Sequence, residues 1–144
     1  MSGFLSTGYF LCPIRISGME SKRATDLVEL TEGSECILAF WSPDCSFCPS
    51  HLDKLEIFAG SSLLRDYQVF AICCGDPEMG MIKGRTQTGL QRWHRIQQYY
   101  ASPESVELIK GSVDMDRFPW YVVVDSSGMV MRSASDFDMS QIAK

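Results

Sequence analysis

Residues 36–60, CILAFWSPDCSFCPSHLDKLEIFAG, contain the signals that decide the fold. The first six residues form a continuous apolar run, which is typical of a strand covered on both faces, and the turn formers at 42–44 end it. From Cys45 onward the apolar side chains follow one helical stripe until the final glycine. Pro49 fits this helix only in the first turn, where a missing N–H has no intrahelical acceptor to lose. The sequence therefore predicts a strand–turn–helix unit with Cys45 and Cys48 at the turn.

Cys45 and Cys48 are separated by two residues, a spacing that can close a small disulfide ring. At the start of a helix the first thiol faces backbone N–H groups and the positive end of the helix dipole, and both favour the thiolate. We therefore expect Cys45 to be the nucleophile of disulfide exchange and Cys48 to resolve the mixed disulfide. Two other interpretations stay open: half of a zinc site completed by Cys73, Cys74 or His51, and two thiols that are merely buried.

The segments that follow predict an α/β order. Residues 68–74 have the pattern of a second buried strand, and the apolar spacing over 90–100 predicts a crossover helix that lets the two strands run parallel. Residues 120–125 and 129–132, separated by a short loop with a glycine, predict a β-hairpin. A short closing helix is expected over 137–143. The expected fold class is α/β, with a central mixed sheet flanked by helices.

Composition excludes several classes of protein. The chain has 144 residues, 45% of them hydrophobic and 22% charged, which predicts one domain over residues 1–144 and excludes disorder as the main state. The net charge of −5, with basic side chains single or in short pairs, argues against nucleic acid as a partner. The longest apolar runs, 37–41 and 120–124, are shorter than the roughly 20 residues that a membrane helix needs. Residues 1–14 lack the basic start and long apolar core of an export signal.

Two segments carry a resemblance to a known family. Residues 40–48, FWSPDCSFC, resemble the active-site segment of thioredoxin-fold proteins, in particular the extracytoplasmic TlpA-like thiol-disulfide oxidoreductases. Residues 118–130, FPWYVVVDSSGMV, resemble the second signature of that family, a cis-proline that opens a strand ending in Asp and a glycine hairpin. The resemblance implies a thioredoxin-like α/β fold. The two signatures are far apart in this chain, which is similar to the TlpA-like branch of the family. In that branch a helix is inserted between the βαβ half and the C-terminal hairpin, and here it is expected at 90–100.

The resemblance also implies a function: a thiol-disulfide oxidoreductase, either a protein disulfide reductase or an isomerase, with Cys45 and Cys48 catalytic. Pro119 has no N–H beside the reactive sulfur, and with Phe118 it is expected to dock an extended substrate segment, a contact that an exposed Trp120 widens. The implied partners are protein thiols or disulfides and a redox partner, with no cofactor, no metal and no nucleic acid. The family suggests an extracytoplasmic compartment, whereas the four further cysteines are more typical of a reducing one.

The active-site segment departs from the family pattern. Thioredoxins proper carry a buried Asp where this chain has Ala39, so no proton acceptor for Cys48 is identified. Asp44 opposes thiolate formation at the next residue by its charge, and is interpreted as a solvated turn residue or as a proton relay. Ser46 can donate a hydrogen bond to a thiolate, whereas Phe47 cannot. The direction of electron flow therefore stays open.

The remaining cysteines are interpreted mainly as core side chains, since free cysteine is among the most buried residue types. Cys12 and Cys36 belong to this group. Cys73 and Cys74 end the strand expected beside the active-site strand, and the alternation of side chains sends them to opposite faces. At most one of them can therefore reach the site, and Cys74 is the accessory candidate for a third redox thiol.

Two other functions compete with disulfide exchange. A thiol peroxidase of the same superfamily is suggested by the proline and cysteine pattern at 43–49, although its spacing is one residue short. A binding or chaperone module would instead hold clients in an apolar groove around Phe47, Phe118 and Trp120. Substitution of Cys45 by Ser separates the enzyme from the module, because only the enzyme would lose disulfide reduction.

Overall fold

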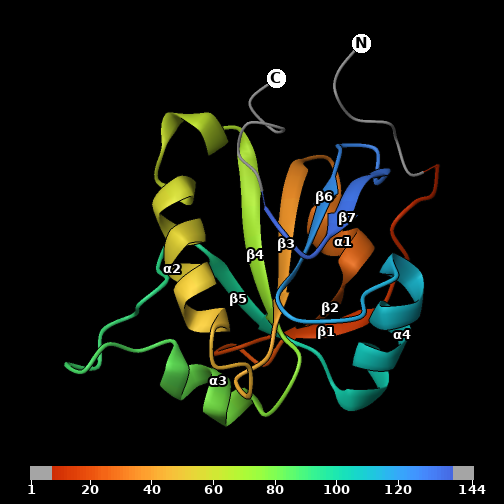
Figure 1. Ribbon diagram of the computed structural model, residues 1–144. Helices are drawn as coiled ribbons and strands as arrows, with labels where there is room; N and C mark the ends of the chain where they lie inside the picture. Colours follow the sequence, from red (N-terminus) through yellow and green to blue (C-terminus); the bar gives the residue numbers. More distant parts are fainter. Residues whose placement is uncertain (1–7, 138–144) are drawn as a thin grey trace.

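The computed structural model describes residues 8–137, which form a sheet between two layers of helices. The elements, in chain order, are β1 (Arg15–Gly18), β2 (Ala24–Asp26), α1 (Leu27–Thr31), β3 (Glu35–Trp41), α2 (Cys48–Ala59), η1 (Ser62–Leu64), β4 (Tyr67–Cys73), α3 (Pro77–Lys83), β5 (Gln97–Tyr100), α4 (Pro103–Val113), β6 (Trp120–Val124) and β7 (Val130–Ala134). Helices α2 and α3 lie on one side of the sheet, and α1 and α4 on the other (Figure 1). Within this part of the chain, no helix is long and apolar enough to cross a membrane.

The sheet has seven strands in the order β2-β1-β5-β4-β3-β6-β7. Strand β3 pairs in parallel with β4 and antiparallel with β6, and β4 pairs in parallel with β5. The prediction of a mixed α/β sheet is therefore confirmed. Every residue from Cys36 to Trp41 is fully buried, as expected of a central strand that is covered by helices on both faces.

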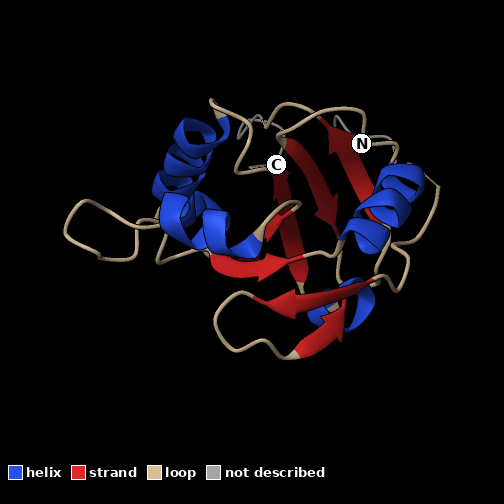
Figure 2. Cartoon of the chain, turned by 90° about the horizontal axis from the view of Figure 1, so that it is seen from below, coloured by secondary structure: helices blue, strands red, loops and turns tan. Residues whose placement is uncertain are grey.

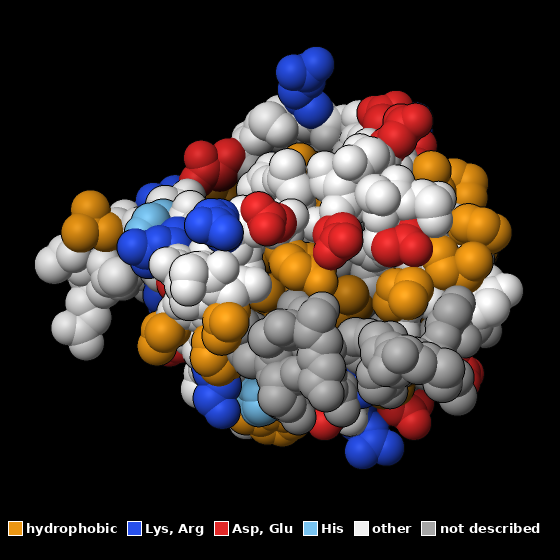
Figure 3. All heavy atoms as spheres, turned by 90° about the horizontal axis from the view of Figure 1, so that it is seen from above, with side chains coloured by type: hydrophobic (Ala, Val, Ile, Leu, Met, Phe, Trp, Pro, Cys, Tyr) orange, Lys and Arg blue, Asp and Glu red, His pale blue; other side chains and the backbone are white. Residues whose placement is uncertain are grey.

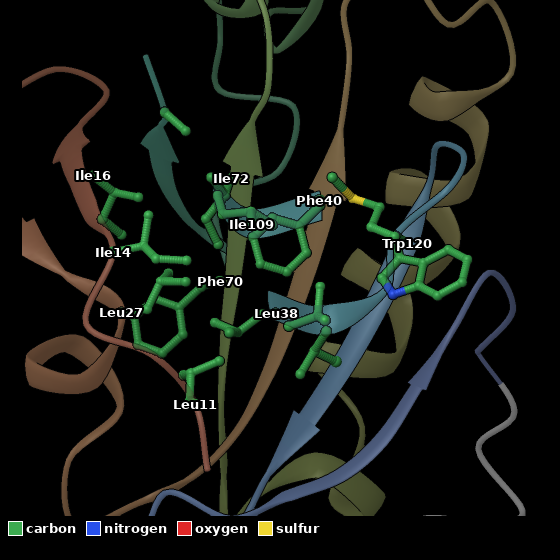
Figure 4. Packing of buried hydrophobic residues seen from close by; sticks show 14 of the residues in the cluster. Leu11, Ile14, Ile16, Leu27, Leu38, Phe40, Phe70, Ile72, Ile109 and Trp120 are labelled. Carbon is green, nitrogen blue, oxygen red and sulfur yellow. The ribbon is translucent and has the colours of Figure 1, made fainter. Parts of the chain in front are cut away.

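Two cores lie on the two faces of the sheet, and alternation along β3 decides which side chain joins which core. We name them after the helices that cover them. The α2-side core receives Ile37, Ala39 and Trp41, and the α4-side core receives Cys36, Leu38 and Phe40. In the α4-side core, Phe40 and Phe70 of the sheet lie among side chains of α1 and α4, including Leu27 and Ile109 (Figure 4). Cys36 is thus a core residue, as predicted.

The prediction of a helix over residues 90–100 is wrong. Residues 97–100 form β5, and the segment before it is an irregular loop. Trp93 and Ile96 are both buried, so an apolar spacing of three arises here without a helix. The loop is held instead by α2, because Asp53 accepts hydrogen bonds from the Arg92 side chain (2.6 and 2.8 Å) and from Trp93 Nε1 (2.8 Å). The helices between β4 and the hairpin are α3 and α4.

The predicted hairpin is confirmed as β6 and β7, which pair antiparallel. Asp125 Oδ1 accepts hydrogen bonds from the N–H groups of Ser127 (2.9 Å) and Met129 (3.0 Å), and Gly128 has the positive φ of 90° that the loop requires. The closing helix expected over 137–143 lies, apart from its first residue, outside the described residues.

The parallel strands β3 and β4 end at the same edge of the sheet, at the lower end of the molecule that Figure 2 views from below. Their following turns touch there. The Cys74 N–H donates to the Trp41 carbonyl (2.7 Å), and a Cβ added to Gly75 would lie 2.9 Å from Pro43 Cδ. At the opposite end, basic and acidic side chains are interspersed on the surface (Figure 3). Four of the six cysteines therefore lie at one end of the sheet: Cys45, Cys48, Cys73 and Cys74.

Candidate active site

Cys45 and Cys48 lie at the turn between β3 and α2, as predicted. The Cys45 N–H donates to the Ser42 carbonyl (3.1 Å), and the Cys48 N–H donates to the Cys45 carbonyl (3.2 Å). Cys48 is the first residue of α2 and is fully buried, whereas Cys45 is partly exposed. Pro49 stands in the first turn, and no side chain caps the helix. The positive end of the α2 dipole therefore lies at the turn that carries the cysteines.

The environment of Cys48 favours its protonated form. Burial raises the pKa of the Cys48 thiol to about 12. A hydrogen bond with the Cys45 side chain raises this pKa as well, while a hydrogen bond with the Ser42 backbone lowers it. Cys48 therefore keeps its proton near neutral pH and is hydrogen-bonded to the partly exposed Cys45.

The second signature segment meets the first at Cys45. The Cys45 thiol donates to the carbonyl oxygen of Phe118 at 3.8 Å, although the two residues are 73 positions apart in the chain. The Phe118–Pro119 peptide bond is cis. Phe118 is partly exposed and Pro119 is buried. The structure thus brings together the two segments that carry the family resemblance.

Solved structures with a similar fold include disulfide exchange proteins. The thioredoxin domain of a thiol-disulfide oxidoreductase from Bacteroides vulgatus matches with a TM-score of 0.67 and 16% identity, over 96% of this chain and 94% of the other. A thiol:disulfide interchange protein from Bacteroides sp. matches with a TM-score of 0.71 and 16% identity, over 95% and 86% of the two chains. A secreted disulfide oxidoreductase from Mycobacterium tuberculosis matches with a TM-score of 0.65 and 13% identity, over 91% and 92%. The chain has the thioredoxin fold.

At these identities the structural likeness establishes the fold alone. No family model matches the sequence, and no curated protein matches it. The thioredoxin-like fold class predicted from residues 40–48 and 118–130 is confirmed, and the chemistry must be argued from the side chains at the site.

Trp120 corrects one expectation about this thioredoxin fold. The residue is only 9% exposed and belongs to the α4-side core, so it cannot widen a substrate contact at Cys45. Its Nε1 donates to Ser133 Oγ (2.9 Å), and that hydroxyl donates to the Val113 carbonyl (2.6 Å). The physical reason is register: Trp120 pairs with Phe40 in the sheet, and both side chains face α4.

The prediction that Cys74 is the accessory thiol is also wrong. Cys73 and Cys74 do face opposite sides of the sheet, but Cys73 is the one that shares the α2-side core with Cys48, and Cys74 lies in the α4-side core. Burial raises the pKa of the Cys73 thiol to about 12. Cys12, expected in the core, is exposed, since it lies in the irregular segment before β1.

Three side chains of the active-site turn, those of Asp44, Ser46 and Phe47, are exposed to solvent. The Asp44 N–H donates to Ser42 Oγ (3.2 Å). Phe47 is 54% exposed, with its ring 5.9 Å from that of His51 in an edge-on contact. Because its side chain is exposed, Asp44 has the surroundings of a solvated turn residue.

Among residues 8–137, no group of three or more His, Cys, Asp or Glu side chains is placed to hold a metal ion.

Tyr121 is a residue of the site that sequence reasoning missed. It lies opposite Ala39 in the pairing of β3 with β6 and is only 3% exposed. Tyr121 belongs to the same α2-side core as Cys48, and Cys45 packs against that core. Burial raises the pKa of the Tyr121 hydroxyl, and the charges of Cys48 and Cys45 raise it further. The missing information was the strand register, because a one-residue slip would have turned this side chain to the other face.

Proposed function

We propose that this protein is a thiol-disulfide oxidoreductase of the TlpA-like type, which exchanges disulfides with protein substrates through Cys45-Ser46-Phe47-Cys48. The observation that carries the proposal is the pairing of a partly exposed Cys45 with a buried, protonated Cys48 at the start of α2. This division suits two different tasks. An accessible thiol can attack a protein disulfide, and a sheltered one can wait to resolve the product.

The proposed reaction proceeds in two balanced steps. The Cys45 thiolate attacks one sulfur of a substrate disulfide, forms a mixed disulfide and releases the other substrate sulfur as a thiolate. Cys48 then loses its proton and attacks Cys45 Sγ, so that the Cys45–Cys48 disulfide forms and the second substrate sulfur leaves. The substrate gains two electrons and the dithiol loses them. The reverse sequence oxidises a substrate, and an unidentified redox partner would restore the starting state.

Phe118 and Pro119 are proposed to dock the substrate. The Phe118 carbonyl lies 3.8 Å from Cys45 Sγ, so a backbone held along Phe118 would bring a substrate sulfur close to the nucleophile. Pro119 offers no N–H that would compete for the reactive sulfur. An extended segment of a protein substrate fits this requirement, because it can add backbone hydrogen bonds beside Phe118 without filling a pocket.

The solved structures support the proposal by what their names say of them: two are thiol-disulfide exchange proteins and a third is a secreted disulfide oxidoreductase. By the same comparison we propose an extracytoplasmic location and a single thioredoxin-like domain over residues 1–144. Exchange of disulfides with exported proteins is chemically consistent with such a compartment.

Reduction of insulin by dithiothreitol tests the proposal. The wild-type protein should accelerate insulin precipitation, and Cys45→Ser should abolish the acceleration. Cys12→Ser is the matched control, because Cys12 is exposed and lies outside the site; its activity should equal that of the wild type. Full activity in Cys45→Ser would contradict the proposed enzyme, and undiminished binding of unfolded clients by this variant would favour a binding module instead.

A further inference from the structure

The two carboxylates of α2 are paired with the loop before β5. The Arg92 side chain donates to Asp53 at 2.6 Å. Arg95 donates to Glu56 twice, at 3.3 Å through its side chain and at 3.0 Å through its N–H. The negative charges of this helix are therefore compensated within the protein, at the face that the loop covers.

The two basic side chains of α2, His51 and Lys54, have no such partners. Within residues 8–137 neither of them forms an ion pair or a side-chain hydrogen bond. Their spacing of three residues puts them on the same face of the helix. The uncompensated charge of α2 is thus the positive charge of Lys54, to which His51 adds when it is protonated. This face is a local exception in a chain whose net charge is −5.

Both basic side chains line a cavity of about 190 Å³ between α2 and the residues that follow β7. Tyr121 and Ser135, which carry hydroxyl groups, line it as well. The only carboxylate among the described residues around the cavity is that of Asp136, and it is paired with Arg132 at 2.7 Å. The cavity therefore combines an unpaired positive charge with hydroxyl groups, and a carboxylate is the group that suits such surroundings best.

The cavity lies next to the proposed exchange site. The ring of His51 is 5.9 Å from that of Phe47, which stands between the two exchange cysteines and is 54% exposed. Lys54 follows Cys48 along α2, at a rise of about 9 Å. An extended chain covers this distance in about three residues. A substrate segment whose cysteine has reached Cys45 can therefore pass over Phe47 and place a side chain at Lys54.

We propose that this cavity binds an acidic side chain of the protein substrate, with Lys54 as the residue that determines the preference and His51 beside it. The inference rests on the proposed function and adds a substrate class to it. That class is extended segments with an aspartate or glutamate about three residues from the reactive cysteine. The substrate carboxylate forms an ion pair with the Lys54 ammonium group and so holds the segment beside Cys45 while the disulfides exchange.

Pairs of short peptides that differ only in aspartate or asparagine test this preference. Each peptide has a single cysteine, joined as a mixed disulfide to thionitrobenzoate. The variable residue stands at the stated spacing, before the cysteine in one pair and after it in the other, because either chain direction can reach Lys54. The Cys45 thiolate attacks the peptide sulfur, the Cys45–peptide disulfide forms, and thionitrobenzoate leaves as a coloured thiolate whose release gives the rate.

The protein for this experiment carries Cys12→Ser, because Cys12 is exposed and would react as well. In this parent, Lys54→Gln removes the charge and keeps the length of the side chain. Lys83→Gln is the matched control, because Lys83 is an exposed lysine of α3 that does not line the cavity. Comparing the two variants separates the charge at the cavity from the net charge of the protein.

We expect the parent to react about fivefold faster with the aspartate peptide of one pair than with its asparagine partner, the effect of one exposed ion pair at low ionic strength. High salt should remove most of this preference. Lys54→Gln should lower the ratio of the two rates below about twofold, and Lys83→Gln should keep the parent ratio.

Equal rates within both peptide pairs, a preference that survives in Lys54→Gln, or an equal loss in both lysine variants would overturn the inference and leave the proposed function intact. Thionitrobenzoate release by the parent that is no faster than release by Cys45→Ser would overturn the proposed function, and this inference with it.

Discussion

Two cysteine pairs lie at the same edge of the sheet, and they have opposite properties. Cys45 and Cys48 follow β3 and span a turn that runs into α2, whereas Cys73 and Cys74 are adjacent residues at the end of β4. The first pair shares a hydrogen bond and one face of the sheet. The second pair is divided between the two cores, with both thiols buried.

The difference shows that backbone conformation, more than closeness in sequence, makes a redox pair. Adjacent residues on a strand point to opposite faces, so Cys73 and Cys74 cannot meet without breaking the end of β4. The tight turn after β3 and the start of α2 instead bring Cys45 and Cys48 to the same face of the sheet. The end of β3 at Trp41 is therefore as important for forming the redox pair as the cysteines themselves, because the turn begins there.

The largest expected effect is on the lifetime of the mixed disulfide. In Cys48→Ala the Cys45–substrate disulfide has no resolving thiol, and its lifetime should increase by at least about a hundredfold because an intramolecular attack is lost. Cys74→Ala is the control and should resolve as fast as the wild type. Gel electrophoresis of acid-quenched reactions with a single-disulfide protein measures both. If the Cys48→Ala adduct decays at the wild-type rate, another thiol resolves it and the contrast between the pairs fails.

An effect of intermediate size is expected on the free energy of unfolding, at the contact between α3 and Cys73. A Cβ added to Gly80 would lie 2.8 Å from Cys73 Sγ and 3.2 Å from Met19 Cε. Gly80→Ala should therefore lower the free energy of unfolding by about 1–3 kcal/mol through overpacking. Gly111→Ala in α4 meets no atom within 4 Å and should raise it by about 0.5–1 kcal/mol. Urea denaturation measures both variants.

The double variant sharpens this result. Replacing Cys73 by Ala removes the sulfur that the new methyl group meets, so Gly80→Ala should cost less in that background than in the wild type. Equal effects of Gly80→Ala and Gly111→Ala on the unfolding free energy would show that α3 does not press on Cys73.

The smallest effect is on the alkaline stability. The pKa of Cys73 is raised from 9.0 to about 12, mainly by burial. The folded state therefore keeps this proton when the unfolded chain has lost it, and the stability present below pH 9 falls as the pH rises toward 12. Between pH 8 and pH 10 the loss is about 1.4 kcal/mol for one thiol. Cys73→Ala should make the fall shallower by about that amount, measured as urea unfolding at pH 8 and pH 10. An identical slope in both proteins would contradict a buried, protonated Cys73.

Local signals predicted the half of the fold that holds the site. The apolar run at 36–41, the turn after it and the stripe of the following helix are contiguous in sequence, and each specifies its element without distant information. The hairpin loop at 125–129 is similar, because the Asp125 side chain and Gly128 form the turn by themselves. Helices α3 and α4 carry local signals too: Asp76 before Pro77, and Ser102 before Pro103, are N-cap and first-turn pairs.

What sequence could not supply was pairing between distant segments. The apolar spacing at 93 and 96 fits a helix as well as a loop, and the hydrogen bonds from that loop to Asp53 on α2 decide between them. The orientation of Trp120 and Tyr121 depends on the register of β6 against β3. A register one residue away would have exchanged their faces, placing a tryptophan at the site and the tyrosine in the other core.

Disulfide mapping by mass spectrometry, after equilibration in glutathione buffers of graded potential, tests the central claim most directly. We predict a single intramolecular disulfide between Cys45 and Cys48 that forms in one two-electron transition, with Cys36, Cys73 and Cys74 still reduced. A protein in which Cys45 carries glutathione while Cys48 stays a free thiol across the whole range, or in which Cys48 bridges to another cysteine, would contradict it.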